Sequence, residues 1–321
     1  MNMNAQVAYE GKTVSQPFAK AIVELGHENP RIVALTGDLG KYTDLYPFKE
    51  VFPERYFQIG MAEQNLFGVA AGMTQTGLIP YATTYGVFAT RRANEQIAID
   101  INYSRANVKI ICGLPGLTTP IGASHQATED LALMRVMPGM TVLEPCDAVE
   151  LYQATKAIAE FDGPVYMRLQ RGEVPVFFDE NDYKFELGKA KILHSGGNDL
   201  VIISLGLMTR HAFEAVQTLE KEGIKATLIH VSTLKPFDSE LILEQIAKVH
   251  AIVTCENHSV IGGLGSCVAE IAAVNGVHVA LRMVGVQDVY ASFGSTPYLF
   301  RKYGLDSAAI DKRAKEVLEV R

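Results

Sequence analysis

The sequence predicts an α/β protein made of two consecutive, doubly wound domains with mostly parallel sheets. Short apolar runs alternate with helical stretches along the 321 residues, which is typical of parallel sheets covered by helices on both faces. The alternation pauses once, between residues 171 and 187, and then begins again. A chain of this length also suggests about two domains of roughly 150 residues each.

The first domain is expected to cover residues 1–180. Its strands are predicted where the apolar runs are continuous, at residues 32–35, 56–59, 79–81, 108–112, 141–143 and 165–169. Helices are predicted between them, at residues 16–26, 64–76, 88–104, 127–136 and 148–161. Because ligands of open α/β sheets bind beyond the carboxyl ends of the strands, the loops after these strands are the places to search for a site.

Residues 181–188 are assigned to a linker, within a stretch that contains Pro, Asp and Phe but no clear period. The second domain is expected to cover residues 189–321. It has predicted strands at 200–204, 226–230, 251–255 and 277–283, and predicted helices at 208–222, 239–249 and 264–274. Gly206, Gly223 and Gly276 fall at the turns between these elements, where glycine is common.

Composition excludes several classes of protein. The net charge is −7 and both signs are spread along the chain, which argues against the basic stripe of a nucleic-acid surface. No apolar run reaches the ~20 residues of a membrane span, and residues 1–12 lack the apolar core of a secretory signal. The four cysteines form no CxxC pair. We therefore expect a cytoplasmic protein with reduced thiols and no membrane or nucleic-acid partner.

Glu63 is the most informative residue. It follows the predicted strand 56–59 and opens the helix 64–76, which has almost no polar face and is expected to be buried. A carboxylate at such a position loses hydration, which favours its protonated form unless a partner compensates. Glu63 is therefore either a helix cap or a group that holds a proton for chemistry.

Aromatic and histidine side chains occupy two further loops. Tyr85 and Phe88 lie three residues apart after the strand 79–81, where they could form a flat wall for a planar ring or ordinary core. His125 ends a long loop with glycines at 116 and 122, directly before a helix. Loops of this length are usually functional. His125 could act as an acid or base, donate to a developing oxyanion, or bond the backbone at the helix entry.

Charged residues follow other strands of the first domain. Asp38 comes after the strand 32–35, and Arg168 and Arg171 lie at the end of the strand 165–169. A guanidinium at a strand end can bind a phosphate or carboxylate through two hydrogen bonds, or form a structural ion pair. In the second domain, the GGxG sequence at 262–265 precedes a helix. It could bind an anion or be only a tight turn.

The ordered set of these motifs resembles the C-terminal half of transketolase, and more closely the separate C-terminal subunit of a split transketolase. The motifs are Gly37-Asp38-Leu39, Met61-Ala62-Glu63-Gln64-Asn65, Tyr85 to Phe88, Ser124-His125-Gln126, Arg171-Gly172-Glu173-Val174-Pro175 and Glu256-Asn257-His258. The resemblance extends from about Thr13 to Met283. It implies a pyrimidine-binding domain, followed by a C-terminal domain that supports dimerisation.

The resemblance also implies a transferase that uses thiamine diphosphate. By family analogy, Glu63 bonds N1′ of the aminopyrimidine and thereby activates the cofactor, while Tyr85 and Phe88 pack on the pyrimidine ring. Asp38 matches an acidic residue near the cofactor. His125 matches a histidine beside the reacting carbonyl, and Arg171, with Arg168 near it, matches an arginine that binds substrate phosphate.

The family's diphosphate site has no counterpart in this chain. Other members hold the diphosphate through Mg²⁺ or another divalent metal bound by a Gly-Asp-Gly motif, and this sequence contains none. We therefore expect no metal ligands here. The expected partner is an N-terminal transketolase-type subunit that carries Gly-Asp-Gly, in an α2β2 heterotetramer.

The substrate loop departs from the family pattern at two positions. Gly113 stands where many transketolases have a histidine that contacts sugar phosphate, and Ile121 where they have an aspartate that helps select a hydroxylated donor. Many transketolases also have an N-terminal arginine that helps to bind phosphate, and no residue near Val14 and Ser15 clearly matches it. A lost donor weakens discrimination between substrates. A modified or branched sugar, or a smaller acceptor, therefore fits as well as a pentose phosphate.

Alternatives of the same cofactor class are a deoxyxylulose phosphate synthase-like chain and the β-subunit of a 2-oxo acid dehydrogenase. An alternative of another class is a non-catalytic regulatory subunit on the same fold. The retention of Glu63, Tyr85, Phe88 and His125 argues against loss of function.

Overall fold

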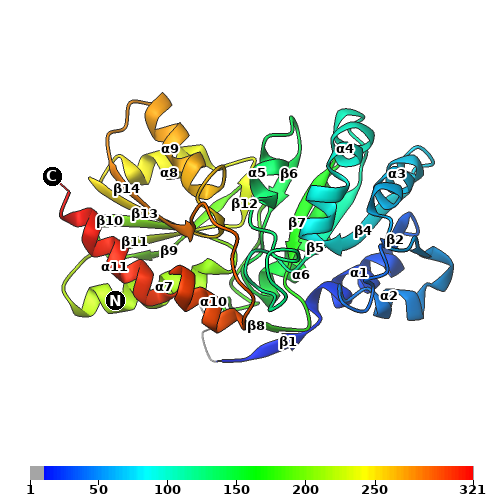
Figure 1. The fold of residues 1–321 in the computed structure, drawn as a ribbon, viewed down its shortest axis with the longest axis horizontal. Coiled ribbons are helices and arrows are strands. Elements are labelled where there is room, and N and C mark those ends of the chain that lie inside the picture. Colours follow the sequence, from blue (N-terminus) through cyan, green and yellow to red (C-terminus); the bar gives the residue numbers. More distant parts are fainter. Residues whose placement is uncertain (1–10, 321) are drawn as a thin grey trace.

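The computed structural model describes residues 11–320. The first ten residues, on which the expectation of a missing secretory signal partly depends, lie outside this range. Two large sheets with helices on both faces, and a small two-stranded sheet, make up the described part of the molecule (Figure 1). This confirms the prediction of two consecutive α/β domains with mostly parallel sheets. Within residues 11–320, no helix has the length and apolar character needed to cross a membrane.

The first sheet has seven strands in the order β12-β6-β7-β5-β4-β2-β3. Six of them are parallel and come from the first domain: β2 (Ile32–Thr36), β3 (Tyr56–Gln58), β4 (Ile79–Tyr85), β5 (Lys109–Gly113), β6 (Thr141–Leu143) and β7 (Val165–Leu169). The buried residues of these strands are mostly apolar, which suits strands covered on both sides.

Two cores enclose this sheet. On one face, α1 (Pro17–Glu28), α2 (Tyr46–Val51) and α6 (Ala148–Glu160) contribute buried residues to one cluster. On the other face lie α3 (Glu63–Thr74), α4 (Asn94–Gln96) and α5 (Asp130–Arg135). A short 3-10 helix, η1 (Pro53–Arg55), leads into β3. The carboxyl ends of the strands form one edge, where the candidate site lies.

The second sheet has five strands in the order β14-β13-β10-β11-β9. They are β9 (Ala190–Ser195), β10 (Leu200–Leu205), β11 (Ala226–Val231), β13 (Ala251–Ser259) and β14 (Ala280–Val286), and only β9 is antiparallel. Helices α7 (Met208–Lys221) and α11 (Ser307–Leu318) contact each other. Helices α8 (Ser239–Ile246) and α9 (Leu264–Val274) lie on the opposite side of the sheet, and α10 (Thr296–Tyr303) precedes α11 (Figure 1).

The boundary between the domains is more closely packed than the sequence suggested. Strand β12 (Thr233–Lys235) belongs to the second domain but pairs antiparallel with β6 of the first. The stretch where the alternation pauses, residues 171–187, contains β8 (Glu173–Pro175), which pairs with β1 (Thr13–Ser15). Its aromatic side chains Phe177, Phe178 and Tyr183 are buried in the core of the second domain. The domains therefore share a continuous interface.

Residues 88–104 were expected to form one α-helix and do not. They form two π-helical segments, η2 (Phe88–Arg92) and η3 (Ile97–Tyr103), on either side of α4. In this part of the chain Thr90 Oγ1 donates a hydrogen bond to the carbonyl of Gly86 at 2.8 Å. Wider helical turns of this kind are common at functional sites, and η2 carries three side chains of the site described below.

Candidate active site

Glu63 is the first residue of α3, and its side chain is 1% exposed. Its carboxylate oxygen Oε2 accepts a hydrogen bond from Nη1 of Arg92 at 2.7 Å, and Oε1 accepts one from Thr84 Oγ1 at 3.5 Å. Among the hydrogen bonds of the described residues, none joins this carboxylate to a backbone N–H of α3. The capping role is therefore not the one observed. Glu63 is a buried carboxylate at the edge of the sheet.

Three rings gather beside this carboxylate edge. The rings of Tyr85 and Phe88 have centroids 5.9 Å apart and are tilted by 32°. The imidazole of His125 meets both nearly edge-on, at 6.2 Å from Tyr85 and 5.3 Å from Phe88. Burial raises the pKa of Tyr85, so its hydroxyl stays a neutral hydrogen-bond donor. The aromatic pair and the histidine predicted from separate loops are thus in contact.

Arg91 holds the loop that carries His125. Its guanidinium donates hydrogen bonds to the carbonyl oxygens of Ala123 at 2.8 Å and Gln126 at 3.3 Å, and forms an ion pair with Glu129. The Glu129 carboxylate raises the pKa of Arg91. Sequence reasoning missed Arg91. The available signal was its position in a pair of consecutive arginines, three residues after Phe88, in a stretch with few other charges.

The second domain ties down the same loop through Asn257. Its Oδ1 accepts the backbone N–H of Leu117 at 2.9 Å, and its Nδ2 donates to the carbonyl of Pro115 at 3.2 Å. Gly116 approaches so closely that a Cβ there would lie 2.1 Å from the Asn257 carbonyl oxygen, and its φ is +51°. The Glu-Asn-His motif therefore joins the two domains beneath the site.

The glycine-rich turn at 262–265 binds an anion, but the anion is internal. The carboxylate of Glu256 accepts the backbone N–H groups of Leu264 at 2.8 Å and Gly265 at 2.9 Å. This contact satisfies donors at the start of α9 that would otherwise be free. The possibility of an external anion at this turn is therefore not supported.

Arg171 lies in the exposed turn after β7, with its guanidinium carbon 6.0 Å from the centre of the Tyr42 ring. The turn is fixed by Asp44, whose Oδ2 accepts the N–H of Gly172 at 2.7 Å and whose Oδ1 accepts Nε2 of Gln16 at 3.3 Å. Burial raises the pKa of Asp44, although these hydrogen bonds and Arg171 act in the opposite direction. Arg171 is thus held in place but open to a ligand.

Arg168 does not lie in the site, contrary to its expected role in substrate binding. It is 1% exposed. Its guanidinium forms ion pairs with the buried carboxylates of Asp130 and Glu144 and donates to the carbonyls of Ala127 at 3.0 Å and Asn257 at 3.1 Å. The two carboxylates raise the pKa of Arg168 in spite of its burial. The structural ion pair, which the sequence also allowed, is the arrangement observed.

Asp38 lies at the end of β2 in a left-handed conformation, with φ of +62°. Its Oδ1 accepts Nε2 of Gln58 at 2.6 Å, and its N–H donates to Oε1 of the same side chain at 2.9 Å. The preceding residue, Gly37, would place a Cβ 3.7 Å from Glu63 Oε1. Asp38 therefore follows a residue that lies near the Glu63 carboxylate, and its own side chain is bonded to Gln58 at the end of β3.

The two unusual loop positions leave space rather than polar groups. A Cβ at Gly113 would meet the Tyr85 ring at 3.4 Å and the Thr43 methyl group at 3.6 Å, both ordinary contacts. Ile121 is 54% exposed on the same loop as His125. Gly113 thus has room for a Cβ, Ile121 extends toward solvent, and neither residue has a polar side chain.

One cluster in the described chain has three side chains of metal-ligand type, namely Cys146, Glu150 and His230. All three are buried, and His230 Nε2 and Glu150 Oε1 are 3.0 Å apart. Tyr183 and the N–H of Cys146 also bond this carboxylate. Mg²⁺ prefers oxygen ligands, so the cluster fits a hydrogen-bonded network between the domains rather than a site for that ion.

The four cysteines are all buried and free. Burial raises the pKa of Cys267 to about 12 and raises those of Cys112, Cys146 and Cys255 as well. Thiols of this kind are unreactive core residues, as the sequence suggested.

Comparison with known proteins agrees with this geometry. The transketolase pyrimidine binding domain matches residues 10–176, and the transketolase C-terminal domain matches residues 188–310. The chain belongs to the transketolase family. A transketolase family protein of Sinorhizobium fredii is 48% identical over 94% of this chain and 88% of its own length.

Other members of the transketolase family are similar over nearly the whole chain. A 6-deoxy-6-sulfo-D-fructose transketolase subunit of a Clostridium species is 40% identical over 99% of this chain and 98% of its own length. A solved structure described as a split gene transketolase, inactive beta4 tetramer, has a TM-score of 0.88 and 46% identity, with 96% of this chain and 99% of that chain covered. A 1-deoxy-D-xylulose-5-phosphate synthase of Heliobacterium modesticaldum is 33% identical, and this chain spans 47% of it.

Proposed function

We propose that this chain is one subunit of a thiamine diphosphate-dependent transketolase. The complex transfers a two-carbon ketol unit between a ketose donor and an aldose acceptor. A partner chain supplies the diphosphate and divalent-metal site. The observation that carries the proposal is the convergence of a buried carboxylate, two aromatic rings and a histidine at the carboxyl edge of the first sheet.

The residues present fit the pyrimidine end of the cofactor. Glu63 is a desolvated carboxylate and can share a proton with a ring nitrogen. Tyr85 and Phe88 present faces on which a planar ring can pack, and Asp38 lies at the neighbouring strand end. When bound, the cofactor supplies the carbon–carbon bond chemistry.

The remaining residues act on the substrate. His125 lies against the aromatic pair, where it can donate a proton to a carbonyl oxygen and take it back. Arg171, which Asp44 holds through the adjacent Gly172, can bind a phosphate or another anionic group. Neither Gly113 nor Ile121 has a polar side chain that could bind a substrate. These features favour an anionic sugar of unusual structure.

Two relatives support this substrate class by what their names state. One is the 6-deoxy-6-sulfo-D-fructose transketolase subunit described above. The other is an apulose-4-phosphate transketolase subunit of Phocaeicola vulgatus, which is 35% identical over 94% of this chain. Both are subunits rather than complete enzymes, and both names give sugars outside the common pentose phosphates. A modified or branched ketose with one anionic group is therefore the donor class proposed.

A partner chain is supported by the outer face of α3. The sequence suggested that this helix is buried, but only one side of it packs against its own chain. The other side carries Gln64, Asn65 and Gly72, which are exposed, and a Cβ at Gly72 would have nothing within 4 Å. Met61 is 78% exposed just before the helix. A partner helix could approach closely where Gly72 leaves room.

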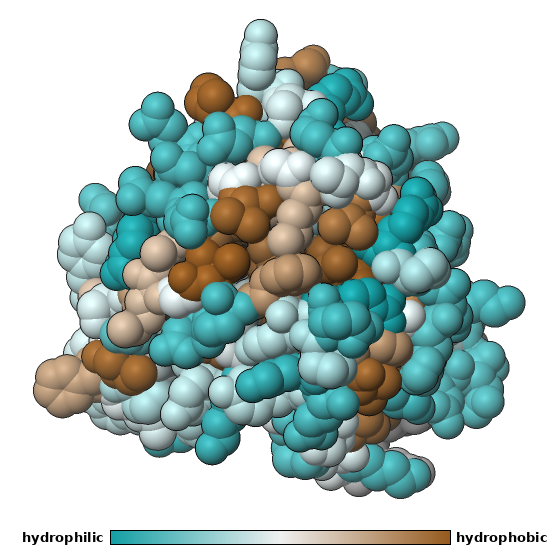
Figure 2. Space-filling model, turned by 90° about the vertical axis from the view of Figure 1, so that its right-hand side faces the viewer, coloured by the Kyte–Doolittle hydropathy of each residue, from teal (hydrophilic) through white to brown (hydrophobic). Residues whose placement is uncertain are grey.

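Figure 2 shows the side of the molecule that lies at the right of Figure 1, where apolar residues form a continuous patch. Helix α3 lies at this side of the molecule, and its Val69 and Met73 are apolar and only partly buried. Patches of this kind on a protein of this size mark interaction surfaces. A relative's β chains alone are described as inactive, which supports a requirement for the partner. We propose an α2β2 heterotetramer.

The test is reconstitution with the N-terminal transketolase-type subunit that carries Gly-Asp-Gly. The complex is screened with ketose and aldose phosphates, sulfonated and unphosphorylated sugars, and 2-oxo acids. Ketol transfer only in the presence of both chains supports the proposal. Tight binding of thiamine diphosphate and turnover by this chain alone would contradict it. Condensation of pyruvate with an aldose phosphate would favour the synthase-like alternative, and acyl transfer to a lipoyl partner the dehydrogenase-like one.

A further inference from the structure

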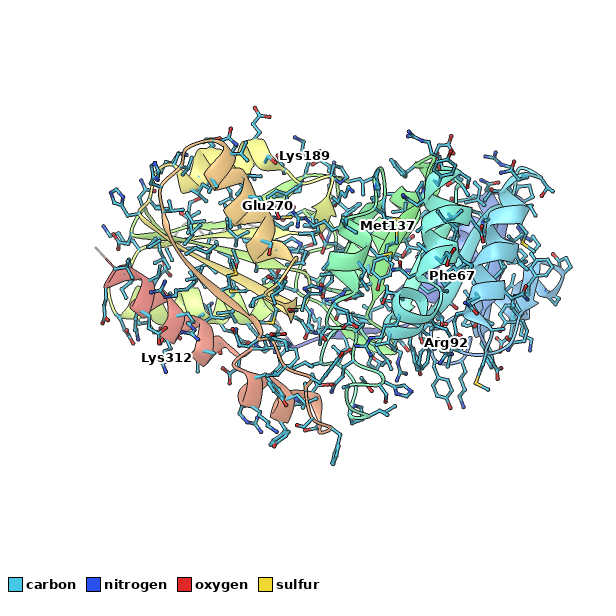
Figure 3. The ribbon with its side chains drawn as sticks, turned by 45° about the horizontal axis from the view of Figure 1, so that its top comes forward. Phe67, Arg92, Met137, Lys189, Glu270 and Lys312 are labelled. Carbon is cyan, nitrogen blue, oxygen red and sulfur yellow. The ribbon has the colours of Figure 1, made fainter. Side chains whose placement is uncertain are left out.

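Arg92 contacts both groups that the proposed function assigns to the pyrimidine ring. Its Nη1 donates to Oε2 of Glu63 at 2.7 Å, and its guanidinium carbon lies 4.6 Å from the centre of the Phe88 ring. Arg92 is the last residue of η2 and lies on the same side of the sheet as Phe67 of α3 (Figure 3). Its side chain is 50% exposed, whereas that of Glu63 is 1% exposed.

The guanidinium resembles an aminopyrimidine in the two respects that matter here. It is planar and delocalised, so it stacks on an aromatic face, and it presents N–H donors in its own plane. The carboxylate needs such a partner, because an unpaired buried charge is strongly destabilising. In the free chain, Arg92 is the cation that meets this need.

Arg92 can also separate from Glu63. Half of its side chain is in solvent, so its charge remains hydrated when the contact with Glu63 breaks. Arg91, the adjacent arginine, cannot take its place because it is bound to Glu129 and to two carbonyl groups of the His125 loop. The hydroxyl of Thr84 is 3.5 Å from the other carboxylate oxygen and carries no charge.

We propose that Arg92 is the internal occupant of the pyrimidine site and sets the affinity of the complex for its cofactor. In the free chain, Arg92 covers the Phe88 face and neutralises Glu63. Binding of the cofactor displaces it from both. This inference rests on the proposed function, since it assumes that Glu63 and Phe88 meet the pyrimidine ring.

The direction in which one substitution changes the affinity for the cofactor distinguishes this role from that of a permanent structural support. If Arg92 competes with the pyrimidine ring, Arg92→Gln removes the competitor, and thiamine diphosphate binds more tightly to the reconstituted complex. If Arg92 instead steadies Glu63 and Phe88 around the bound ring, the same substitution weakens binding. A half-exposed ion pair, worth about 0.2–1 kcal/mol, predicts an affinity gain of roughly 1.5-fold to fivefold.

The experiment measures the Kd of thiamine diphosphate for the complex by calorimetry at fixed Mg²⁺. Arg92→Gln is expected to lower the Kd. Arg92→Lys keeps the charge but loses the flat face, and its Kd is expected to lie between those of the wild type and Arg92→Gln. The matched control is Arg105→Gln, which removes an exposed arginine from the loop before β5, and should leave the Kd unchanged. An unchanged or higher Kd for Arg92→Gln overturns the proposed role of Arg92 but leaves the proposed function standing. If no form of the complex binds the cofactor, the proposed function fails, and this role fails with it.

A second measurement uses the free chain and needs no cofactor. Melting temperatures are compared for the wild type, Arg92→Gln, Glu63→Gln and the double variant. If Arg92 is the counter-ion of Glu63, Arg92→Gln lowers the melting temperature when Glu63 is present and has little effect when it is glutamine. Equal effects in the two backgrounds would show that the pair does not exist in solution.

Discussion

Arg168→Met is predicted to cause a large loss of stability. Arg168 is 1% exposed, and it is the cation between Asp130 and Glu144, whose side chains are 0% and 1% exposed. Methionine can fill much of the space, but it leaves two buried carboxylates without their partner. Breaking a buried ion pair in this way costs about 3–5 kcal/mol.

This free energy converts to a shift in melting temperature. For 321 residues, an unfolding entropy of about 2.1 cal/mol/K per residue gives about 0.7 kcal/mol/K. The variant is therefore expected to melt roughly 4–7 °C below the wild type at neutral pH. Differential scanning calorimetry measures the shift directly.

The dependence on pH gives the same prediction a second check. In the wild type, Arg168 holds the pKa of Asp130 below its usual range against the effect of burial, while burial raises the pKa of Glu144. Without Arg168, burial is the largest influence on both pKa values, opposed by hydrogen bonds from Tyr166 to Asp130 and from the N–H of Leu207 to Glu144. Both carboxyl groups of the folded variant are therefore expected to bind protons more readily than in the unfolded chain. A group whose pKa is raised in the folded state contributes less to the stability of the protein as pH rises. The deficit of the variant is therefore smaller at pH 5 than at pH 8.

Arg171→Met is the matched control, because Arg171 lies three residues away and is exposed. It is expected to change stability by no more than about 0.5 kcal/mol. A deficit below about 1 kcal/mol for Arg168→Met, or one that does not vary with pH, would refute the assignment of Arg168 to a buried network.

Four further predictions concern the site. Asp44→Ala removes the acceptor of the Gly172 N–H and should raise the KM for an anionic substrate roughly threefold to tenfold with a smaller change in kcat; an unchanged KM in steady-state assays would show that the turn needs no such support. Asn257→Ala breaks two hydrogen bonds to the loop before His125 and should cost about 1–3 kcal/mol in denaturant unfolding, whereas a cost near zero would mean that the loop is held elsewhere. Gly116→Ala should be more harmful than Gly72→Ala, because a Cβ at 116 meets the Asn257 carbonyl at 2.1 Å while one at 72 meets nothing within 4 Å; equal melting temperatures of the two free chains would contradict the close approach. Gly113→His places a Cβ in ordinary contact with Tyr85 and should lower the KM for phosphorylated sugars relative to unphosphorylated ones, and the opposite shift would argue against Gly113 as a determinant of specificity.

The alternation of strands and helices and the candidate site could be predicted because both depend on local patterns. Glu63, Phe88 and His125 follow strands and Tyr85 ends one, and the carboxyl ends of parallel strands meet at one edge. The site residues therefore converge without any knowledge of the sheet order. Arg171 is exposed at the same kind of position for the same reason.

The partners of the arginines could not be predicted in this way. Arg168 pairs with residues 38 and 24 positions away in the chain, and the choice between an ion pair and a ligand site depends on burial that the sequence does not encode locally. Likewise, the apolar face of α3 has the same pattern whether its own chain or another covers it. Strand β12 crosses to the first sheet because of tertiary pairing that no local period reveals.

The central claim is that Glu63 activates a cofactor held jointly with another chain. It is tested most directly by the turnover of the reconstituted complex with Glu63→Gln, a substitution that keeps the size of the side chain and removes its ability to hold a proton. We expect the complex to assemble as the wild type does and kcat to fall by about 10²–10⁴, the usual contribution of a proton-transfer group. Turnover equal to that of the wild type would contradict the account.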